Sequence, residues 1–193
     1  MSDFSITGAI LAGGKGQRMG GVNKGLLIWA DQPLVMHVHQ AMEQVVEDIS
    51  FNTNDHLEAY QVFRVKVISD QDHQNKGPLS GIFSCLQEAQ GSHLLISPCD
   101  TPCISPQAFK VLLESAQKQP DCIVYLSSES GDHPLHGVIP KASINDLERY
   151  LQGNRFNVMG FYQVYGAQAV DWPHESELLN INTQQCLASL TDS

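Results

Sequence analysis

The chain has 193 residues, and 11 lysines and arginines stand against 21 aspartates and glutamates, which gives a formal net charge of −10. Such an acidic chain argues against sequence-independent nucleic-acid binding, which depends on neutralising phosphates, and against an anionic membrane, which attracts polybasic patches. The length and the hydrophobic fraction of 42% are ordinary for one globular domain.

The cysteine pattern and the first residues bear on the compartment. The five cysteines are odd in number and contain no C-x-x-C pair, which argues against a disulfide framework or a zinc site. Met1 to Ser5 include no basic residue, and no later apolar run approaches the ~18 residues of a membrane span. We therefore expect a cytoplasmic protein.

The first half of the chain alternates short apolar runs with helical periodicity. In chain order, the expected elements are a buried strand over 6–12, a helix after Pro33, strands over 49–51 and 65–69, and a helix beginning near Gly77-Pro78.

The second half continues the alternation. Strands are expected over 94–96, 122–126, 135–139 and 164–170, and helices over 144–151, after Thr183 and from Ser105-Pro106. The helix from Ser105-Pro106 has the clearest start, because serine suits an N-cap and proline suits the first helical position. We expect 127–132 to be only a polar loop, and His37 and His39 to be exposed side chains rather than metal ligands.

This order of elements predicts a single α/β domain with a mostly parallel, mixed sheet that helices cover on both faces. Ligands of such sheets bind beyond the carboxyl ends of the strands. Gly13-Gly14, Asn52, Asp70 and Asp100 each follow a predicted strand. We therefore expect these four features to meet along one edge of the sheet.

The first strand leads into a glycine-rich loop, LAGGKGQRMGGVNKG from Leu11 to Gly25. Glycines let backbone N–H groups converge on an anion, and three of the chain's eleven basic residues fall here, as Lys15, Arg18 and Lys24. This clustering favours a polyphosphate ligand.

Two familiar phosphate-binding motifs do not fit this loop. Met19 stands where the G-x-G-x-x-G pattern needs its last glycine, and Lys24 lacks both the glycine before it and the Ser or Thr after it that a P-loop requires. A dinucleotide dehydrogenase and a P-loop NTPase are both disfavoured.

The loop instead matches the pattern L-A-[GA]-G-x-x-x-R-M-G-x-x-K of nucleotidyltransferases. Further segments are GPLSG at 77–81, PCDTP at 98–102, HPL at 133–135 and NINT at 180–183. With these segments, nearly the whole chain resembles the molybdenum cofactor guanylyltransferase family. The resemblance implies a single Rossmann-like nucleotidyltransferase domain over 1–193, with a nucleotide-binding part at about 1–105 and a pterin-side part at about 106–193.

The resemblance also implies an activity, namely transfer of GMP from GTP to the terminal phosphate of molybdenum-bound molybdopterin, with release of pyrophosphate and help from Mg²⁺. It implies protein partners that deliver the cofactor and take the product to molybdoenzymes. Two alternatives stay open: a related transferase that uses CTP or UTP, and a regulatory nucleotide-binding domain, against which the presence of both Lys24 and Asp100 argues.

The same resemblance assigns the site residues. Lys24 and Arg18 would stabilise the pyrophosphate, and Asp100 would bind the metal ion. The nucleotide-binding set is Leu11, Ala12, Gly13, Gly14, Lys24, Asn52, Asp70, Gly77, Pro78, Leu79 and Asp100, and the pterin-side set is Arg155, Asn180 and Asn182.

Two positions refine this prediction. Relatives that use CTP or UTP tend to carry alanine where this chain has Gly13, so a missing methyl group would give room for a purine and favour GTP. Many family members have aspartate before the loop lysine, and this chain has Asn23.

Overall fold

The computed structural model describes residues 4–13, 23–70 and 76–181. Gly14, Arg18, Asn182 and the helix expected after Thr183 therefore lie outside the described residues. A seven-stranded sheet runs through the described part in the order β5-β4-β1-β6-β8-β7-β9. Its strands are β1 (Ile6–Leu11), β4 (Ile49–Asn52), β5 (Lys66–Ile68), β6 (His93–Pro98), β7 (Ile123–Ser128), β8 (Gly131–Pro140) and β9 (Ala167–Asp171).

Among these strands, β8 alone runs antiparallel to its neighbours, β6 and β7, and the other pairings in the sheet are parallel. Strands from both halves of the chain join one sheet, which confirms the mostly parallel mixed sheet of a single domain. The strands at its centre are buried and mostly apolar because both of their faces are covered.

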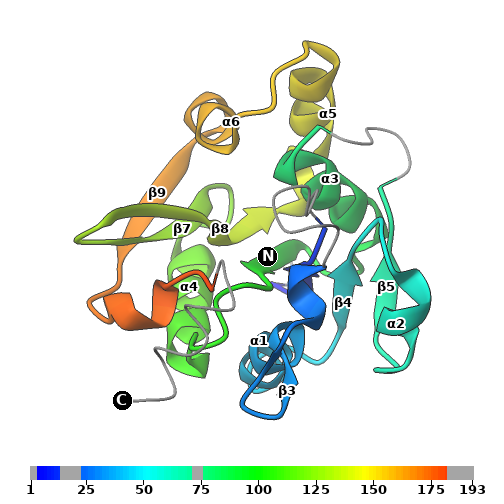
Figure 1. The fold of residues 1–193 in the computed structure, drawn as a ribbon. Coiled ribbons are helices and arrows are strands. Elements are labelled where there is room, and N and C mark those ends of the chain that lie inside the picture. The colour runs from blue at the N-terminus through cyan, green and yellow to red at the C-terminus, as the bar shows by residue number, and fades with distance from the viewer. Residues whose placement is uncertain (1–3, 14–22, 71–75, 182–193) are drawn as a thin grey trace.

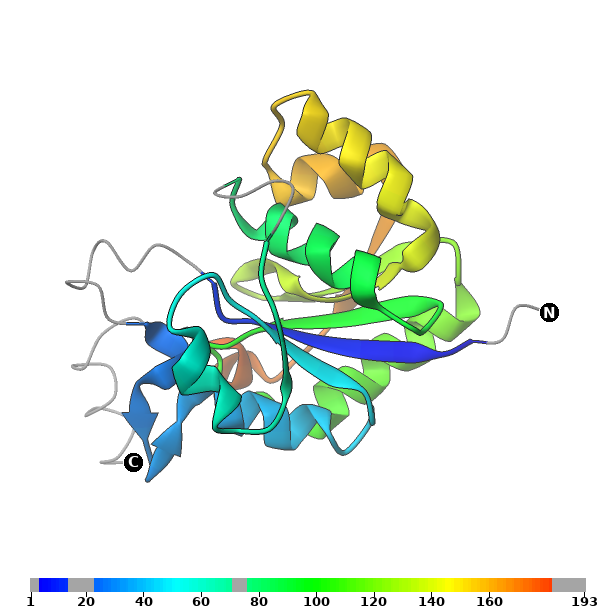
Figure 2. The ribbon, with the colours of Figure 1, turned by 90° about the vertical axis from the view of Figure 1, so that its right-hand side faces the viewer.

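Helices cover the two faces of the sheet, as Figures 1 and 2 show. The apolar side chains of α1 (Leu34–Met42), α2 (Leu57–Gln61) and α4 (Pro106–Lys118) join one buried core. Those of α3 (Pro78–Glu88), α5 (Ile144–Gln152) and α6 (Val158–Tyr165) join a second core on the opposite face. Within the described ranges, no helix combines the length and the apolar character needed to cross a membrane.

Several predicted boundaries are corrected. The strand expected over 164–170 begins only at Ala167, because 158–165 form α6, whose Phe161 and Tyr162 are buried one after the other in the second core. The stretch 127–132, expected to be a polar loop, forms the ends of β7 and β8 and the tight turn between them. Small elements also went unpredicted, namely α2, the ribbon of β2 (Ile28–Trp29) and β3 (Gln32–Pro33), and the 3-10 helices η2 (Lys24–Leu26), η3 (Lys141–Ser143) and η4 (Glu175–Leu178).

The predicted start of α4 is confirmed, although without a capping bond, and the predicted exposure of two histidines is wrong. Ser105 holds the N-cap position of α4, but its buried hydroxyl makes no capping bond, and its backbone N–H donates to Glu177 instead. His37 and His39 are partly buried rather than exposed. His37 hydrogen-bonds to the Trp29 carbonyl at 2.8 Å, so it fastens the β2-β3 ribbon to α1.

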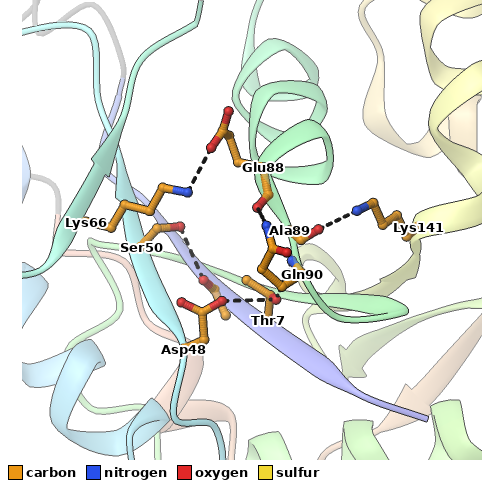
Figure 3. A network of polar contacts seen from close by, with 9 residues as sticks. Thr7, Asp48, Ser50, Lys66, Glu88, Ala89, Gln90 and Lys141 are labelled. Carbon is orange, nitrogen blue, oxygen red and sulfur yellow. Dashed lines mark hydrogen bonds and ion pairs between the residues drawn. The ribbon is translucent and has the colours of Figure 1, made fainter. Parts of the chain in front are cut away.

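A polar network at the amino ends of the parallel strands fixes the far end of α3 (Figure 3). Lys66 at the start of β5 pairs with Glu88 at the end of α3 at 2.8 Å. The hydroxyl of Thr7 in β1 donates to Asp48 at 3.3 Å and accepts the N–H of Gln90 at 3.2 Å. These contacts tie the C-terminal end of α3 to the amino ends of β1 and β5.

Candidate active site

The register of the parallel strands brings the predicted strand-end residues together. Leu11 lies beside Asn52 on one side and beside Pro98 on the other. Asn52 in turn lies beside Ile68. Gly13, Asp70 and Asp100 follow these strands by two residues each, so they share one edge of the sheet with Asn52. Leu11 and Ala12 are buried there, whereas Gly13 is exposed.

Lys24 and Asp100 face each other at this edge. The ammonium nitrogen of Lys24 lies 3.4 Å from Oδ2 of Asp100, although 76 residues separate them. Their side chains are 35% and 17% exposed, so both charges can meet a ligand from solvent. A cation and a carboxylate held this close suit the triphosphate of a nucleotide and the metal ion that accompanies it.

Two neighbours of Asp100, the segment at Ile181 and the thiol of Cys99, bear on its role. The backbone carbonyl of Asp100 accepts the N–H of Ile181 at 2.7 Å. This hydrogen bond places the preceding residue, the exposed Asn180, beside the segment that carries Asp100. Burial raises the pKa of the neighbouring Cys99 thiol to about 12, so this thiol stays protonated. Cys99 is therefore a packing residue of the core and not a nucleophile or a thiolate ligand.

A set of amides surrounds the Asp70 carboxylate. Asn52 donates from Nδ2 to Oδ1 of Asp70 at 2.9 Å, and Asn54 donates from Nδ2 to Oδ2 at 2.9 Å. The Asp70 N–H returns a hydrogen bond to Asn54 at 2.7 Å. Asp70 thus fixes the orientation of two amides at the strand edge. The sequence reasoning missed Asn54, although a second asparagine two residues after Asn52 was an available signal.

The start of α3 closes the same side of the site. A Cβ at Gly81 would lie only 2.1 Å from Oδ1 of Asn52, so only glycine lets the helix approach this amide. Gly77 and Pro78 are exposed at the beginning of the helix. Leu79 is fully buried in the second core, so only its backbone can meet a ligand.

The predicted pterin-side residues fall at two places. Arg155 is exposed between α5 and α6 and lies 4.3 Å over the ring of Tyr150. Its neighbour Phe156 lies near Lys76 and Gly77, at the start of α3. Asn180 instead lies beside Asp100, as described above. The structure therefore places Arg155 toward the α3 end of the site and Asn180 toward the Lys24 end.

The residues at this edge fit a metal ion that arrives with the nucleotide. Over 4–13, 23–70 and 76–181, the structure holds no group of three His, Cys, Asp or Glu that could bind a metal ion by themselves. Asp100 is one carboxylate beside the Lys24 ammonium. Mg²⁺ often takes one or two carboxylates and completes its shell with substrate phosphates and water. The donor set therefore suits an Mg²⁺–triphosphate complex as substrate.

Comparison with known proteins agrees with this geometry. Residues 8–165 match the model of the MobA-like NTP transferase domain. A molybdenum cofactor guanylyltransferase of Mannheimia succiniciproducens is 37% identical over 180 residues, which cover 93% of this chain and 95% of that protein. One of Pseudomonas fluorescens is 33% identical over 181 residues, which cover 93% and 90%.

Solved structures share the fold. The molybdopterin-guanine dinucleotide biosynthesis protein A of Archaeoglobus fulgidus superimposes with a TM-score of 0.77 at 19% identity, over 96% of this chain and 97% of that one. The matched domain, the curated relatives and this structure each cover most of the chain. The chain therefore belongs to the MobA-like NTP transferase family of nucleotidyltransferase enzymes.

Proposed function

We propose that this chain transfers GMP from GTP to the terminal phosphate of molybdenum-bound molybdopterin, in the biosynthesis of the molybdenum cofactor. The curated relatives described above carry the name of this activity over more than nine-tenths of the chain. The single observation that carries the proposal is the pairing of Lys24 with Asp100 at the edge that also holds Asn52 and Asp70. A triphosphate and a nucleoside would be bound there side by side.

The reaction needs placement and charge neutralisation more than covalent catalysis. An oxygen of the pterin phosphate attacks the α-phosphorus of GTP and forms a new P–O bond. The bond from that phosphorus to the bridging oxygen of the β-phosphate breaks, and pyrophosphate leaves with the electron pair. No general base is required because the attacking phosphate is already ionised.

Each charged residue then has a defined task. Asp100 would hold Mg²⁺, which supplies positive charge to the reacting phosphates when it is bound. Lys24 would neutralise the leaving pyrophosphate, together with Arg18. Asn180 would meet the pterin substrate from the segment that is hydrogen-bonded to Asp100. The proposal includes partner proteins, which would deliver the pterin substrate to this chain and take the product from it.

The proposed base preference depends on Gly13. A Cβ at this position would meet its protein neighbours at 3.6 Å or more, which is ordinary contact, so the fold itself does not demand glycine. The missing methyl group would therefore serve the ligand, by leaving space for a purine.

The test is transfer of label from α-labelled GTP to molybdopterin, with α-labelled CTP as the competing substrate. We expect transfer with GTP and little with CTP. Asp100→Asn should lower the rate on the order of a hundredfold or more, the scale of losing one charge-stabilising group. Glu88→Gln, which removes an ion pair at the opposite end of the sheet, is the matched control. Equal use of CTP, or full activity of Asp100→Asn, would contradict the proposal.

A further inference from the structure

The turn that carries Lys24 is short. Lys24 begins η2, a 3-10 helix of three residues, and its side chain has four rotatable bonds. Asn23 caps this turn, because its Oδ1 accepts the N–H of Gly25 at 3.0 Å. Backbone hydrogen bonds from the Leu26 N–H to the Asn23 carbonyl at 3.2 Å and from the Leu27 N–H to the Lys24 carbonyl at 3.0 Å also close the turn, and Oδ1 of Asn23 holds the Gly25 N–H. A second contact reaches the same oxygen from a distant part of the chain.

That contact comes from Tyr60 of α2. The Tyr60 hydroxyl donates to Oδ1 of Asn23 at 2.7 Å, across 37 positions of sequence. The tyrosine is fully buried, and its ring meets Phe51 edge-on at 5.8 Å and Phe63 at 6.3 Å. Burial raises the pKa of the phenol, so it remains protonated and keeps donating. The oxygen of Asn23 is thus fixed from the rigid core below it.

Gly25 shows independently how close this contact is. A Cβ on Gly25 would lie 2.3 Å from the Tyr60 hydroxyl oxygen, a distance that real side chains do not adopt. Only glycine at this position lets the phenol reach beneath the turn. The residues on both sides of Lys24 are therefore adapted to the tyrosine, one as acceptor and the other by its lack of a side chain.

We propose that Tyr60 is a positioning residue, which acts through Asn23 to hold the Lys24 ammonium at the phosphates of the nucleotide. This inference rests on the proposed role of Lys24. Asn23 suits this role because its side chain is neutral and carries an acceptor oxygen. The amide oxygen accepts both hydrogen bonds, as a carboxylate oxygen would, and leaves the Lys24 charge to Asp100 and the phosphates.

The test compares Tyr60→Phe, which removes one hydroxyl, with Tyr162→Phe as a matched control. Tyr162 is also fully buried, and its hydroxyl donates at 2.8 Å to the Pro134 carbonyl, in a different part of the molecule. Calorimetry would measure binding of Mg²⁺–pyrophosphate and, separately, of guanosine, which has no phosphate. Thermal unfolding would show whether both variants lose similar stability.

We expect Tyr60→Phe to weaken pyrophosphate binding about five- to tenfold, the scale of one lost hydrogen bond, and to leave guanosine binding unchanged. Tyr162→Phe should change neither. Asn23→Leu, which also removes the hydrogen bond from the Gly25 N–H, should weaken pyrophosphate binding at least as much, and the double variant Asn23→Leu with Tyr60→Phe should lose no more than Asn23→Leu alone. Unchanged pyrophosphate binding in Tyr60→Phe would overturn the inference, as would an equal loss for guanosine or in the control.

This design separates the inference from the proposed function. Pyrophosphate binding requires neither the pterin nor a particular base. A chain that binds pyrophosphate but does not transfer GMP contradicts the proposed function alone, and the Tyr60 comparison still decides the positioning role. A chain that binds no pyrophosphate contradicts both.

Discussion

Substitution of Gly81 by alanine tests whether Asn52 is held in place for the nucleoside. The added Cβ would lie 2.1 Å from Oδ1 and 2.9 Å from Cγ of Asn52. Asn52 is 4% exposed and cannot move away without losing its hydrogen bonds to Asp70 and to the Ile68 carbonyl. Overpacking costs about 1–3 kcal/mol, whereas alanine gains about 1 kcal/mol over glycine inside a helix. The expected net loss of stability is about 0–2 kcal/mol.

Besides this modest loss of stability, the substitution should raise the KM for GTP. A displaced Asn52 would no longer make the contact with the nucleoside that we propose, and one hydrogen bond of about 1.4 kcal/mol corresponds to a tenfold rise in the KM for GTP. Steady-state transfer from labelled GTP measures the KM, and urea unfolding measures the stability. The two effects are separable because the KM is determined on the folded fraction.

The control is the same substitution in an Asn52→Ala background, where the clashing side chain is gone. There, Gly81→Ala should raise the KM no further, because the two changes act through one contact. A wild-type KM in Gly81→Ala, or an equal rise in both backgrounds, would refute the reasoning.

Three more outcomes are expected. Gly13→Ala should leave the free energy of unfolding unchanged, since a Cβ there makes only ordinary contacts, but should raise the KM for GTP relative to that for CTP in the labelled-transfer assay. Burial lowers the pKa of His136 from 6.5 to about 3, so its contribution to stability is present above pH 6.5 and declines as the pH falls toward 3. Urea unfolding should then show about 2 kcal/mol lost between pH 7 and pH 5, a slope that His136→Gln reduces. Thr7→Val should cost about 1–3 kcal/mol in the same measurement, because the buried Gly91 N–H loses its acceptor, with no change in the KM for GTP.

The sequence was most informative where a strand ends in a residue with an evident chemical use. Asn52, Asp70 and Asp100 each follow a predicted strand, and parallel strands necessarily gather their carboxyl ends at one edge. Their meeting in the structure confirms that expectation. The family pattern added the loop lysine, which the fold brings to within 3.4 Å of Asp100.

Contacts that depend on tertiary packing were not predictable in this way. The end of α6 is apolar and aromatic, so the sequence does not separate it from the strand that follows, and only burial against α5 and the sheet decides for helix. Tyr60 was overlooked because it acts from a helix of five residues that lacks a clear start, 37 positions from its partner. The serine's place at the start of α4 was predictable, but the absence of a capping bond from its hydroxyl was not, because that depends on how the side chain packs.

The proposed function requires that Lys24 and Asp100 together bind a magnesium–triphosphate. Calorimetric titration of GTP, with and without Mg²⁺, into the wild-type chain and Asp100→Asn tests it most directly. We predict that Mg²⁺ strengthens GTP binding to the wild-type chain and has little effect on the variant. Equal enhancement by Mg²⁺ in both proteins would contradict the claim.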